Sequence, residues 1–221
     1  MSGFFCLCSC WSEATVKRYT RSMKYLWLLI FAAVLVWSGI NPKDQFTWFL
    51  EVLPALIGIV VLSFTLKKHP LTPLLYLLIL IHCVILMVGG HYTYAEVPLF
   101  DQLAEFMASD RNNYDKVGHF AQGFIPAMIA REILIRAHAV NSRGWLNTFV
   151  ISFCLAFSAF YELIEWWVAE LTGESAEAFL GTQGYAWDTQ SDMFLALIGA
   201  VCALLLLSSL HDKQLKHLRR E

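Results

Sequence analysis

Long apolar runs separated by short polar connections dominate the chain between residues 25 and 210. A helix needs roughly 20 mostly apolar residues to cross about 30 Å of hydrocarbon. The pattern therefore predicts an all-α fold, a polytopic membrane helix bundle with about six transmembrane helices. The six stretches that reach or approach the required length are residues 25–40, 46–66, 71–90, 117–137, 145–169 and 192–210.

Two of these stretches need a separate decision. The first is short, but it lacks a clear small-x-small cleavage site, so we expect a retained helix rather than a signal peptide. The fourth is the least apolar, because it contains His119, Gln122, Arg131 and Glu132. A membrane-spanning helix is the first interpretation of this stretch, and a re-entrant or peripheral helix is the alternative.

A shorter helix is predicted in the connection between the third and fourth stretches. Pro98 opens a run in which Leu99, Leu103 and Phe106 recur at helical spacing. Such a pattern is typical of a short amphipathic helix that lies on a membrane surface, here the outer one. The chain then divides into an amino-terminal arm at 1–24, a single transmembrane domain at 25–210 and a basic tail at 211–221.

Composition agrees with this division. Of 221 residues, 57% are hydrophobic and 15% are charged, with a mean hydropathy of +0.54. A soluble chain usually has about a quarter charged residues, so a soluble globular domain is excluded as the main class. The lipid bilayer is the expected partner, and no nucleic-acid partner is predicted. Cys6, Cys8 and Cys10 crowd the arm, which is expected to be unstructured rather than metal-binding.

Basic residues set the expected orientation. Thirteen of the 16 Lys and Arg residues fall in the arm, the 67–70 connection, the 131–144 region and the tail. Positive charge favours the cytoplasmic side, so we predict a multi-pass protein of a bacterial inner membrane with both termini cytoplasmic. The opposite connections, 91–116 and 170–191, are acidic, and the second contains no Lys or Arg.

Three pairs of ionisable residues stand near the ends of the last three stretches. Asp115 and His119 are four residues apart and share a helix face, which Gln122 continues. Two further pairs share a face in the same way, Glu162 with Glu165 and Asp188 with Asp192. Ionisable residues within spans are costly, so each is a functional candidate by default.

The alternation of the spans predicts that these pairs meet near the outer interface. Carboxylates with an imidazole suit a divalent metal such as Zn, Mn or Mg, and the candidate ligands are His119, Glu162, Asp188 and Asp192. The same groups could act as general acid and base on an outer-leaflet lipid or lipid-linked substrate. The candidate catalytic residues are Glu162, Glu165, His119 and Asp115.

Two other functions stay open at this point. The pairs could form a structural polar network in a scaffold or partner-binding protein, with Lys116 neutralising one carboxylate and Asp115 or Asp188 capping a helix. They could also belong to a small ion-coupled transporter. Glu51 and Arg131 are expected to lie at interfaces, with their charges reaching toward water.

Three motifs carry a resemblance to a known family. They are Tyr114-Asp115-Lys116-Val117-Gly118-His119-Phe120, Tyr161-Glu162-Leu163-Ile164-Glu165-Trp166 and Trp187-Asp188-Thr189-Gln190-Ser191-Asp192-Met193. Together they resemble the YjdF-like bacterial inner-membrane proteins over roughly residues 25–210. The resemblance implies location and topology more than chemistry, since that family has no established biochemical activity.

A looser likeness is to VanZ-like membrane proteins, which also pair an Asp-Lys-x-x-His-Phe helix start with later acidic residues. Asp115, Lys116, His119 and Phe120 match that start. The chain departs from the pattern in its Trp-rich flanks and in having no Arg before the final Asp motif. The likeness implies the cell envelope and lipid-linked or glycopeptide-related stress, without naming a reaction.

Overall fold

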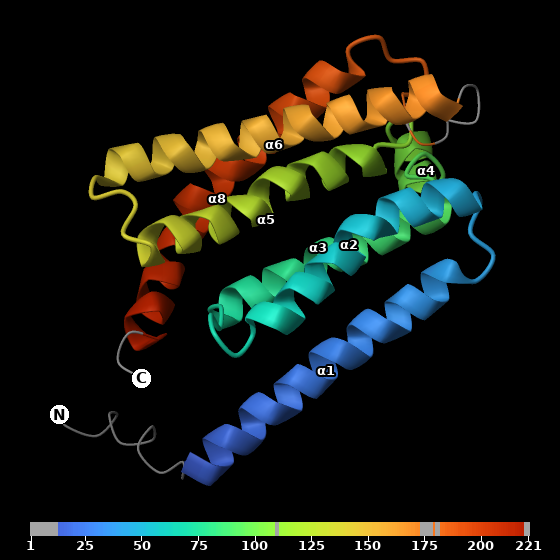
Figure 1. Cartoon of the computed structure of the whole chain (residues 1–221). Coiled ribbons are helices and arrows are strands. Elements are labelled where there is room, and N and C mark those ends of the chain that lie inside the picture. Colours follow the sequence, from blue (N-terminus) through green and yellow to red (C-terminus); the bar gives the residue numbers. More distant parts are fainter. Residues whose placement is uncertain (1–12, 109–110, 173–178, 180–181, 219–221) are drawn as a thin grey trace, which may run out of the picture.

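Helices account for all regular secondary structure in the residues that the structure describes. The structure is a computed structural model that describes residues 13–108, 111–172, 179 and 182–218 (Figure 1). This confirms the all-α fold class; the cysteines of the arm lie outside the described residues. The helices are α1 (Glu13–Gly39), α2 (Gln45–Thr65), α3 (Pro73–Tyr92), α4 (Pro98–Phe106), α5 (Tyr114–Arg136), α6 (Arg143–Thr172) and α8 (Asp188–Leu218).

Four helices, α2, α3, α6 and α8, are long and apolar enough to cross a membrane, judged by length and composition. In α1, the apolar part is the shorter segment Met23–Gly39. Each of the six predicted stretches coincides with a helix, but α1 and α8 run beyond the predicted spans, to Glu13 and Leu218. Hydropathy does not detect these extensions because the added turns are polar. The count of six membrane crossings stays a prediction.

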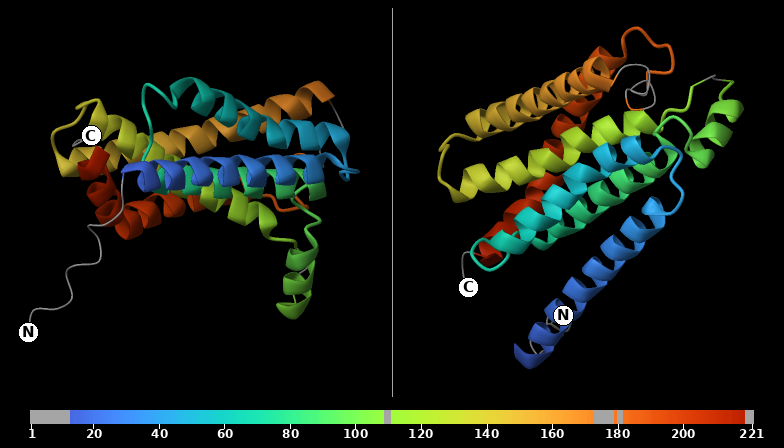
Figure 2. Two further views of the ribbon diagram at one scale, coloured as in Figure 1. Left: turned by 90° about the horizontal axis from the view of Figure 1, so that it is seen from below. Right: turned by 45° about the vertical axis from the view of Figure 1, so that its right-hand side comes forward.

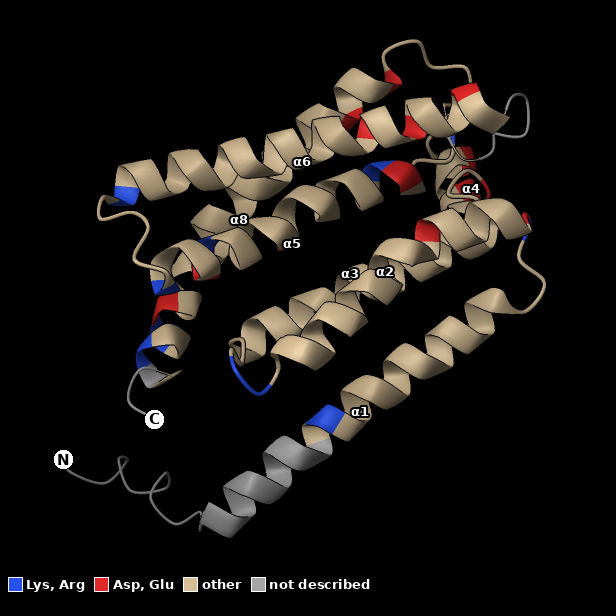
Figure 3. Cartoon of the chain, viewed as in Figure 1, with Lys and Arg blue, Asp and Glu red and all other residues tan. Residues whose placement is uncertain are grey.

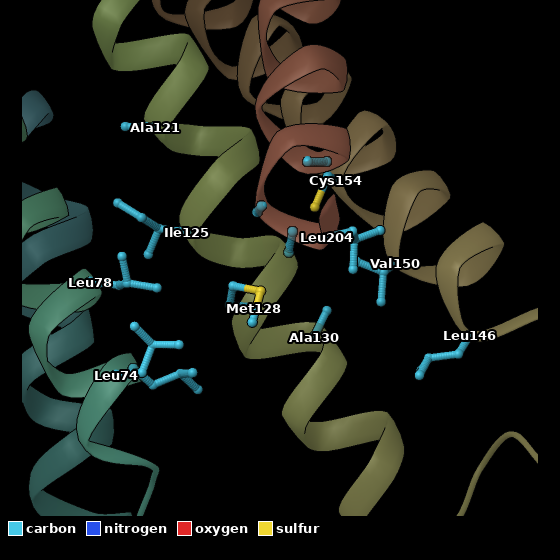
Figure 4. Close-up of a cluster of buried hydrophobic side chains, with 14 residues drawn as sticks. Leu74, Leu78, Ala121, Ile125, Met128, Ala130, Leu146, Val150, Cys154 and Leu204 are labelled. Carbon is cyan, nitrogen blue, oxygen red and sulfur yellow. The ribbon is translucent and has the colours of Figure 1, made fainter. Parts of the chain in front are cut away.

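Helix α5 occupies the middle of the bundle. It packs against α8 along most of its length and also contacts α3 and α6. Figure 4 shows the apolar core around it, where Ile125 and Met128 face Leu74 and Leu78 of α3 on one side and Val150 of α6 on the other. A helix shielded by its neighbours has little contact with lipid, so it can carry polar and small residues. The low hydropathy of the fourth stretch follows from this central position.

Small residues bring α5 and α8 into close contact. A Cβ atom added at Gly123 would lie 1.8 Å from the carbonyl oxygen of Ala196 on α8. One added at Gly199 would lie 2.2 Å from the carbonyl oxygen of Phe120 on α5. Only glycine fits at these two crossing points, and small residues are the usual means of close helix approach in membranes.

Large apolar side chains remain exposed on the outside of the bundle. Examples are Leu29 on α1, Phe64 on α2 and Leu205 on α8, the last two being more than three-quarters exposed at 79% and 78%. A water-soluble monomer rarely presents apolar patches of this extent, whereas lipid covers them without cost. The outer surface therefore has the character of a lipid-facing one.

Helix α1 lies at the edge of the bundle and packs mainly on α3 (Figure 2). Its Phe31 is buried against Val52 and Met87 of the neighbouring helices. Hydrogen bonds reinforce this contact, since the indole Nε1 of Trp27 donates to the carbonyl oxygen of Tyr76 over 2.7 Å. Helix α1 is thus anchored to the bundle along one side.

Charge is distributed unevenly along the bundle. Figure 3 shows Lys and Arg gathered where α8 ends and where α2 and α3 are joined, while Asp and Glu gather at the far ends of α6 and α4. The beginning of α1 and the end of α8 lie at the basic end (Figure 1). Helix α4 projects sideways at the acidic end (Figure 2), with Leu99, Leu103 and Phe106 exposed. The predicted amphipathic helix is present.

Candidate functional site

The start of α5 is fixed by side chains that join it to the preceding loop. Asn112 accepts a hydrogen bond from the backbone N–H of Tyr114 and donates to the carbonyl oxygen of Val97, over 3.1 and 3.0 Å. The ring of Tyr94 lies between Gly89 and Gly118, where any Cβ would meet it within 2.8 Å. Burial raises the pKa of the Tyr94 hydroxyl well above its usual range, so it stays neutral.

His119 is the centre of a buried polar cluster at the acidic end of the bundle. Its Nε2 lies 3.2 Å from Asp115 Oδ1 and 3.9 Å from Asp192 Oδ2, while its Nδ1 lies 3.8 Å from Glu162 Oε1. These acids come from α5, α8 and α6 respectively. The predicted meeting of the three motifs is therefore present. We call Arg111, Asp115, Lys116, His119, Glu162, Asp188 and Asp192 the His119 cluster.

Three residues of the His119 cluster carry donor atoms that lie close enough together to hold a metal ion. One donor atom from each of Asp115, His119 and Asp192 lies within 4.8 Å of the other two, and all three residues are buried. Two carboxylates and an imidazole are suitable ligands for a divalent ion such as Zn²⁺ or Mn²⁺.

Asp188 has a different environment from the other acids. Its Oδ1 accepts hydrogen bonds from Arg111 over 2.5 Å and from Lys116 over 2.8 Å. Lys116 also donates to Ser191 Oγ and to Asp192 Oδ1, each over 2.7 Å. Asp188 was a predicted metal ligand, but the structure places it against two cations. Asp115, which the metal prediction omitted, lies closer to His119.

Glu162 and Glu165 are both buried on α6, on the side of the helix that faces the cluster. Glu162 lies near Thr189 of α8, and its Oε1 has no hydrogen-bond partner in the described structure. The same holds for Asp115 Oδ2. Glu165 lies in electrostatic range of Glu162 and His119. Neither Glu162 Oε1 nor Asp115 Oδ2 has a hydrogen-bond donor, but Arg111 and Lys116 lie 3.6 and 3.8 Å from Asp115 Oδ2, so the Glu162 oxygen is the less compensated of the two. A buried carboxylate oxygen without a donor is costly unless a proton or cation accompanies it.

Glu51 was not among the predicted site residues, although it belongs near this site. The expectation that its charge reaches toward water is wrong, because the residue is 5% exposed on α2. Its Oε2 accepts a hydrogen bond from Tyr161 over 3.4 Å, and it lies in electrostatic range of Asp115 and His119. Its position inside an apolar span was the signal that could have identified it.

A second polar cluster, missed entirely by sequence reasoning, lies at the basic end. His211 Nε2 and Glu132 Oε2 are 2.9 Å apart, Thr72 Oγ1 donates to the same oxygen over 2.9 Å, and Arg136 donates to Glu132 Oε1 over 2.9 Å. Arg131 bonds His211 Nδ1 over 2.8 Å and Asp212 over 2.6 Å. We call Thr72, Arg131, Glu132, Arg136, His211 and Asp212 the His211 cluster.

Two expectations change at the His211 cluster. Arg131 is buried and paired rather than interfacial, because α8 continues as a helix past the predicted end of the span and covers it. Arg131 always carries its protons, so His211 Nδ1 must accept, and the ring is then the neutral tautomer that donates from Nε2 to Glu132. Hydropathy gave no signal here, since residues 211–218 look like a solvated tail.

Comparisons with known proteins also identify a membrane protein. The family described as "Predicted membrane protein (DUF2238)" matches residues 23–213, and the chain belongs to this family. The chain is similar to "Inner membrane protein YjdF" of Escherichia coli (strain K12), with 49% identity over 201 residues, covering 89% of this chain and 96% of that protein. No solved structure matches.

These matches confirm the resemblance to the YjdF-like proteins and support a multi-pass location in an inner membrane. The chain is an integral membrane protein, and the family description assigns no chemistry to it. The function therefore has to be argued from the site itself.

Proposed function

We propose that the His119 cluster is a divalent-metal site that serves an acid–base reaction on a lipid or lipid-linked substrate at the outer leaflet. The observation that carries the proposal is the convergence of Asp115, His119 and Asp192, with donor atoms within 4.8 Å of one another in a buried position. Asp115, His119 and Asp192 would hold the ion. Glu162, 3.8 Å from His119, is the acid that remains to move a proton.

Charge supports the proposal. Asp115, Glu162 and Asp192 surround His119, and Glu51 and Glu165 lie in electrostatic range of it. The permanent cations in contact are Arg111 and Lys116, which also serve Asp188. Uncompensated carboxylates are expensive to bury, so the cluster needs protons or a cation to balance it. A divalent ion at Asp115, His119 and Asp192 would supply that balance.

The chemistry follows from the position of the second acid. A bound divalent ion polarises a substrate oxygen or lowers the pKa of a bound water. Glu162 Oε1, which has no hydrogen-bond donor in the described structure, is placed to accept a proton beside the ion. Glu165 is buried on the same face of α6 as Glu162. Trp166, Trp167 and Trp187 are exposed at this end, at the level where aromatic side chains meet lipid headgroups.

We further infer six membrane crossings with both termini on the cytoplasmic side. The start of α1 and the end of α8 lie at one end of the bundle, as an even number of crossings requires (Figure 1). Basic residues gather at that end, in agreement with the positive-inside rule (Figure 3). The polar composition of α5 is compatible with a crossing because its neighbours shield it from lipid.

A structural network is the main alternative, and one observation favours it. Lys116 places all three of its donors on α8, at Asp188, Ser191 and Asp192, and so ties α5 to α8. Against a purely structural role, Glu162 Oε1 is buried without a hydrogen-bond partner in the described structure. A transporter is less favoured, because a buried apolar core that includes Ile125, Met128 and Leu204 surrounds the middle of α5 (Figure 4).

Metal binding to the purified full-length protein tests the proposal. The protein, stripped with a chelator and then incubated with Zn²⁺ or Mn²⁺, should retain one ion per chain in elemental analysis. His119→Ala and Asp192→Asn should each weaken binding by about 10- to 100-fold or more, because each removes a ligand. Asp212→Asn, an acid of the His211 cluster, serves as the matched control and should retain the metal.

A wild-type protein that holds no stoichiometric metal, while staying folded by circular dichroism, would overturn the metal site. Equal loss of metal in Asp212→Asn and Asp192→Asn would do the same, because it would show that binding is not local to the His119 cluster.

A further inference from the structure

Arg111 and Lys116 are the most exposed charged members of the His119 cluster. Their side chains are 17% and 19% exposed, whereas those of Asp115, Asp188 and Asp192 are 11%, 7% and 4% exposed. A ligand that reaches the cluster from solvent can therefore contact the two cations, and cations select an anion.

Arg111 and Lys116 are arranged to bind one oxyanion together. Both contact the same oxygen, Asp188 Oδ1, over 2.5 and 2.8 Å. The ring of Tyr185 lies beside both cations, 5.3 Å from the Arg111 guanidinium and 5.5 Å from Lys116 Nζ. This shared oxygen shows that the two charged groups converge on one point. Convergent Arg and Lys donors are the usual means of binding a phosphate group.

Asp192 connects this cation pair to the proposed metal site. Its Oδ1 accepts from Lys116 over 2.7 Å, while its Oδ2 faces His119 Nε2 at 3.9 Å. An oxyanion between Lys116 and a metal held by His119 would therefore touch both positive groups at once. A metal ion and a cationic side chain on one phosphate is the arrangement that stabilises phosphoryl chemistry.

Charge neutralisation by the metal strengthens the case. Arg111 and Lys116 are shared between Asp188, Asp115 and Asp192. A divalent ion held by Asp115 and Asp192 would balance those two acids and lessen their demand on the two cations. In the absence of substrate, Asp188 would occupy the position of the phosphate group. A phosphate, with more oxygens and more charge, would then bind beside Asp188 or displace it from the two cations.

We propose that Arg111 and Lys116, facing Asp188 at the rim of the His119 cluster, bind the phosphate group of the substrate. This inference rests on the proposed function for its metal, but the cation pair can be tested separately. The phosphate could belong to a lipid headgroup or to a water-soluble phosphate ester. Trp187, next to Asp188 at the acidic end of the bundle, is exposed, and exposed Trp side chains are typical of the lipid headgroup level. This favours the lipid source.

The test uses full-length protein in phosphatidylcholine nanodiscs, with and without Mn²⁺. A minor fraction of phosphatidic acid is added to one set, oleic acid of equal charge to a second, and inorganic phosphate in solution to a third. Phosphatidic acid should raise the midpoint of thermal unfolding, whereas oleic acid should not. With Mn²⁺, the ³¹P resonance of the bound phosphomonoester should broaden because it lies beside the metal.

Variants separate recognition from folding. Arg111→Gln and Lys116→Gln should abolish the stabilisation, whereas Lys43→Gln, an exposed cation at the same end, should retain it. Asp188→Asn should raise phosphate affinity by roughly tenfold, because it removes the internal anion that competes for the two cations. If Asp188 only held Arg111 and Lys116 in place, Asp188→Asn would lower the phosphate affinity instead.

Stabilisation by phosphatidic acid without Mn²⁺, but no Mn²⁺ binding, would support the cation pair and overturn the metal site. Stabilisation by inorganic phosphate as well would support the pair with a soluble source. Mn²⁺ binding without any phosphate effect, or equal stabilisation by oleic acid, would overturn phosphate recognition. A fall in phosphate affinity in Asp188→Asn would also overturn it.

Discussion

The His119 and His211 clusters lie at opposite ends of the same helix pair and use the same kinds of residues. In the His211 cluster, Glu132 receives donors on both of its oxygens, and the two ring nitrogens of His211 are both bonded. In the His119 cluster, Asp115 and Glu162 each keep one oxygen without a hydrogen-bond partner. Both clusters bury charge, but only one has its acids saturated by protein donors.

This difference separates stabilising from functional polar residues better than burial does. Buried polar groups are normally satisfied, so a cluster whose acids are saturated needs no further explanation than holding helices together. In the His211 cluster, the buried atom left without a hydrogen-bond partner is a donor, Arg131 Nε, and not a carboxylate oxygen. The His211 cluster joins the start of α3, the end of α5 and the end of α8. In an unsaturated cluster, burying carboxylate oxygens without donors costs free energy, and a bound ligand can lower that cost. This difference is why we propose a binding role for the His119 cluster and a structural role for the His211 cluster.

The largest expected effect comes from the close contact between α5 and α8, the two helices that contribute to both clusters. Gly123→Val should prevent the close approach of α5 and α8, because even a Cβ atom would lie 1.8 Å from the Ala196 carbonyl oxygen. We expect a loss of roughly 3 kcal/mol or more, enough to abolish cooperative thermal unfolding in detergent. Gly58→Ala on α2 is the control, since nothing lies within 4 Å of its added Cβ. A folded Gly123→Val protein would contradict the observed packing.

The next effect concerns the saturated cluster. Glu132→Gln places an amide among Thr72, Arg136 and His211, and it leaves Arg136 without the carboxylate that it pairs with. We expect a loss of about 3 kcal/mol, the usual result of breaking a buried pair. The midpoint of thermal unfolding measures it. Metal binding at the other end should not change, and if it did, the two clusters could not be treated as independent.

Glu162→Gln should have a smaller effect on stability and the opposite sign. Its Oε1 has no donor, and it faces Asp192 and Asp115 across His119, so the amide relieves repulsion. In metal-free protein, we expect a gain of about 1 kcal/mol or less in the free energy of unfolding. Thermal unfolding compared with Glu132→Gln gives the sign. Equal destabilisation by both substitutions would show that the clusters have the same role.

The smallest effect is expected at an exposed pair outside both clusters. Lys43 Nζ lies 2.8 Å from Glu96 Oε2 in solvent, and Glu96 raises the pKa of Lys43 above its usual value of 10.5. A raised pKa means that the contribution is complete at neutral pH and is lost as pH rises through the pKa in the folded state. Solvent screens such a pair, so Lys43→Met should not change the unfolding midpoint at neutral pH. A measurable drop would indicate that the loop between α1 and α2 is part of the cooperative unit.

Several features followed from the sequence alone. Apolar runs of span length identified the helices, because lipid-facing surface must be apolar over a length that the bilayer dictates. The pairs Asp115–His119, Glu162–Glu165 and Asp188–Asp192 followed from spacing on one helix face. Their meeting at one end followed from alternating helix direction. Successive helices that cross a bilayer run in alternating directions, so the depth of a residue in the membrane can be derived without knowing its side-chain contacts.

Only the tertiary structure decided which partners these residues have. Asp188 pairs with Arg111 and Lys116 rather than completing the ligand set, because the start of α8 lies beside the start of α5. Glu51 joins from α2, a helix distant in sequence. The His211 cluster arises because α8 continues past the apolar core and covers Arg131. Side-chain pairing depends on the rotation of each helix about its axis and on close contacts such as Gly123 on Ala196, which hydropathy does not encode.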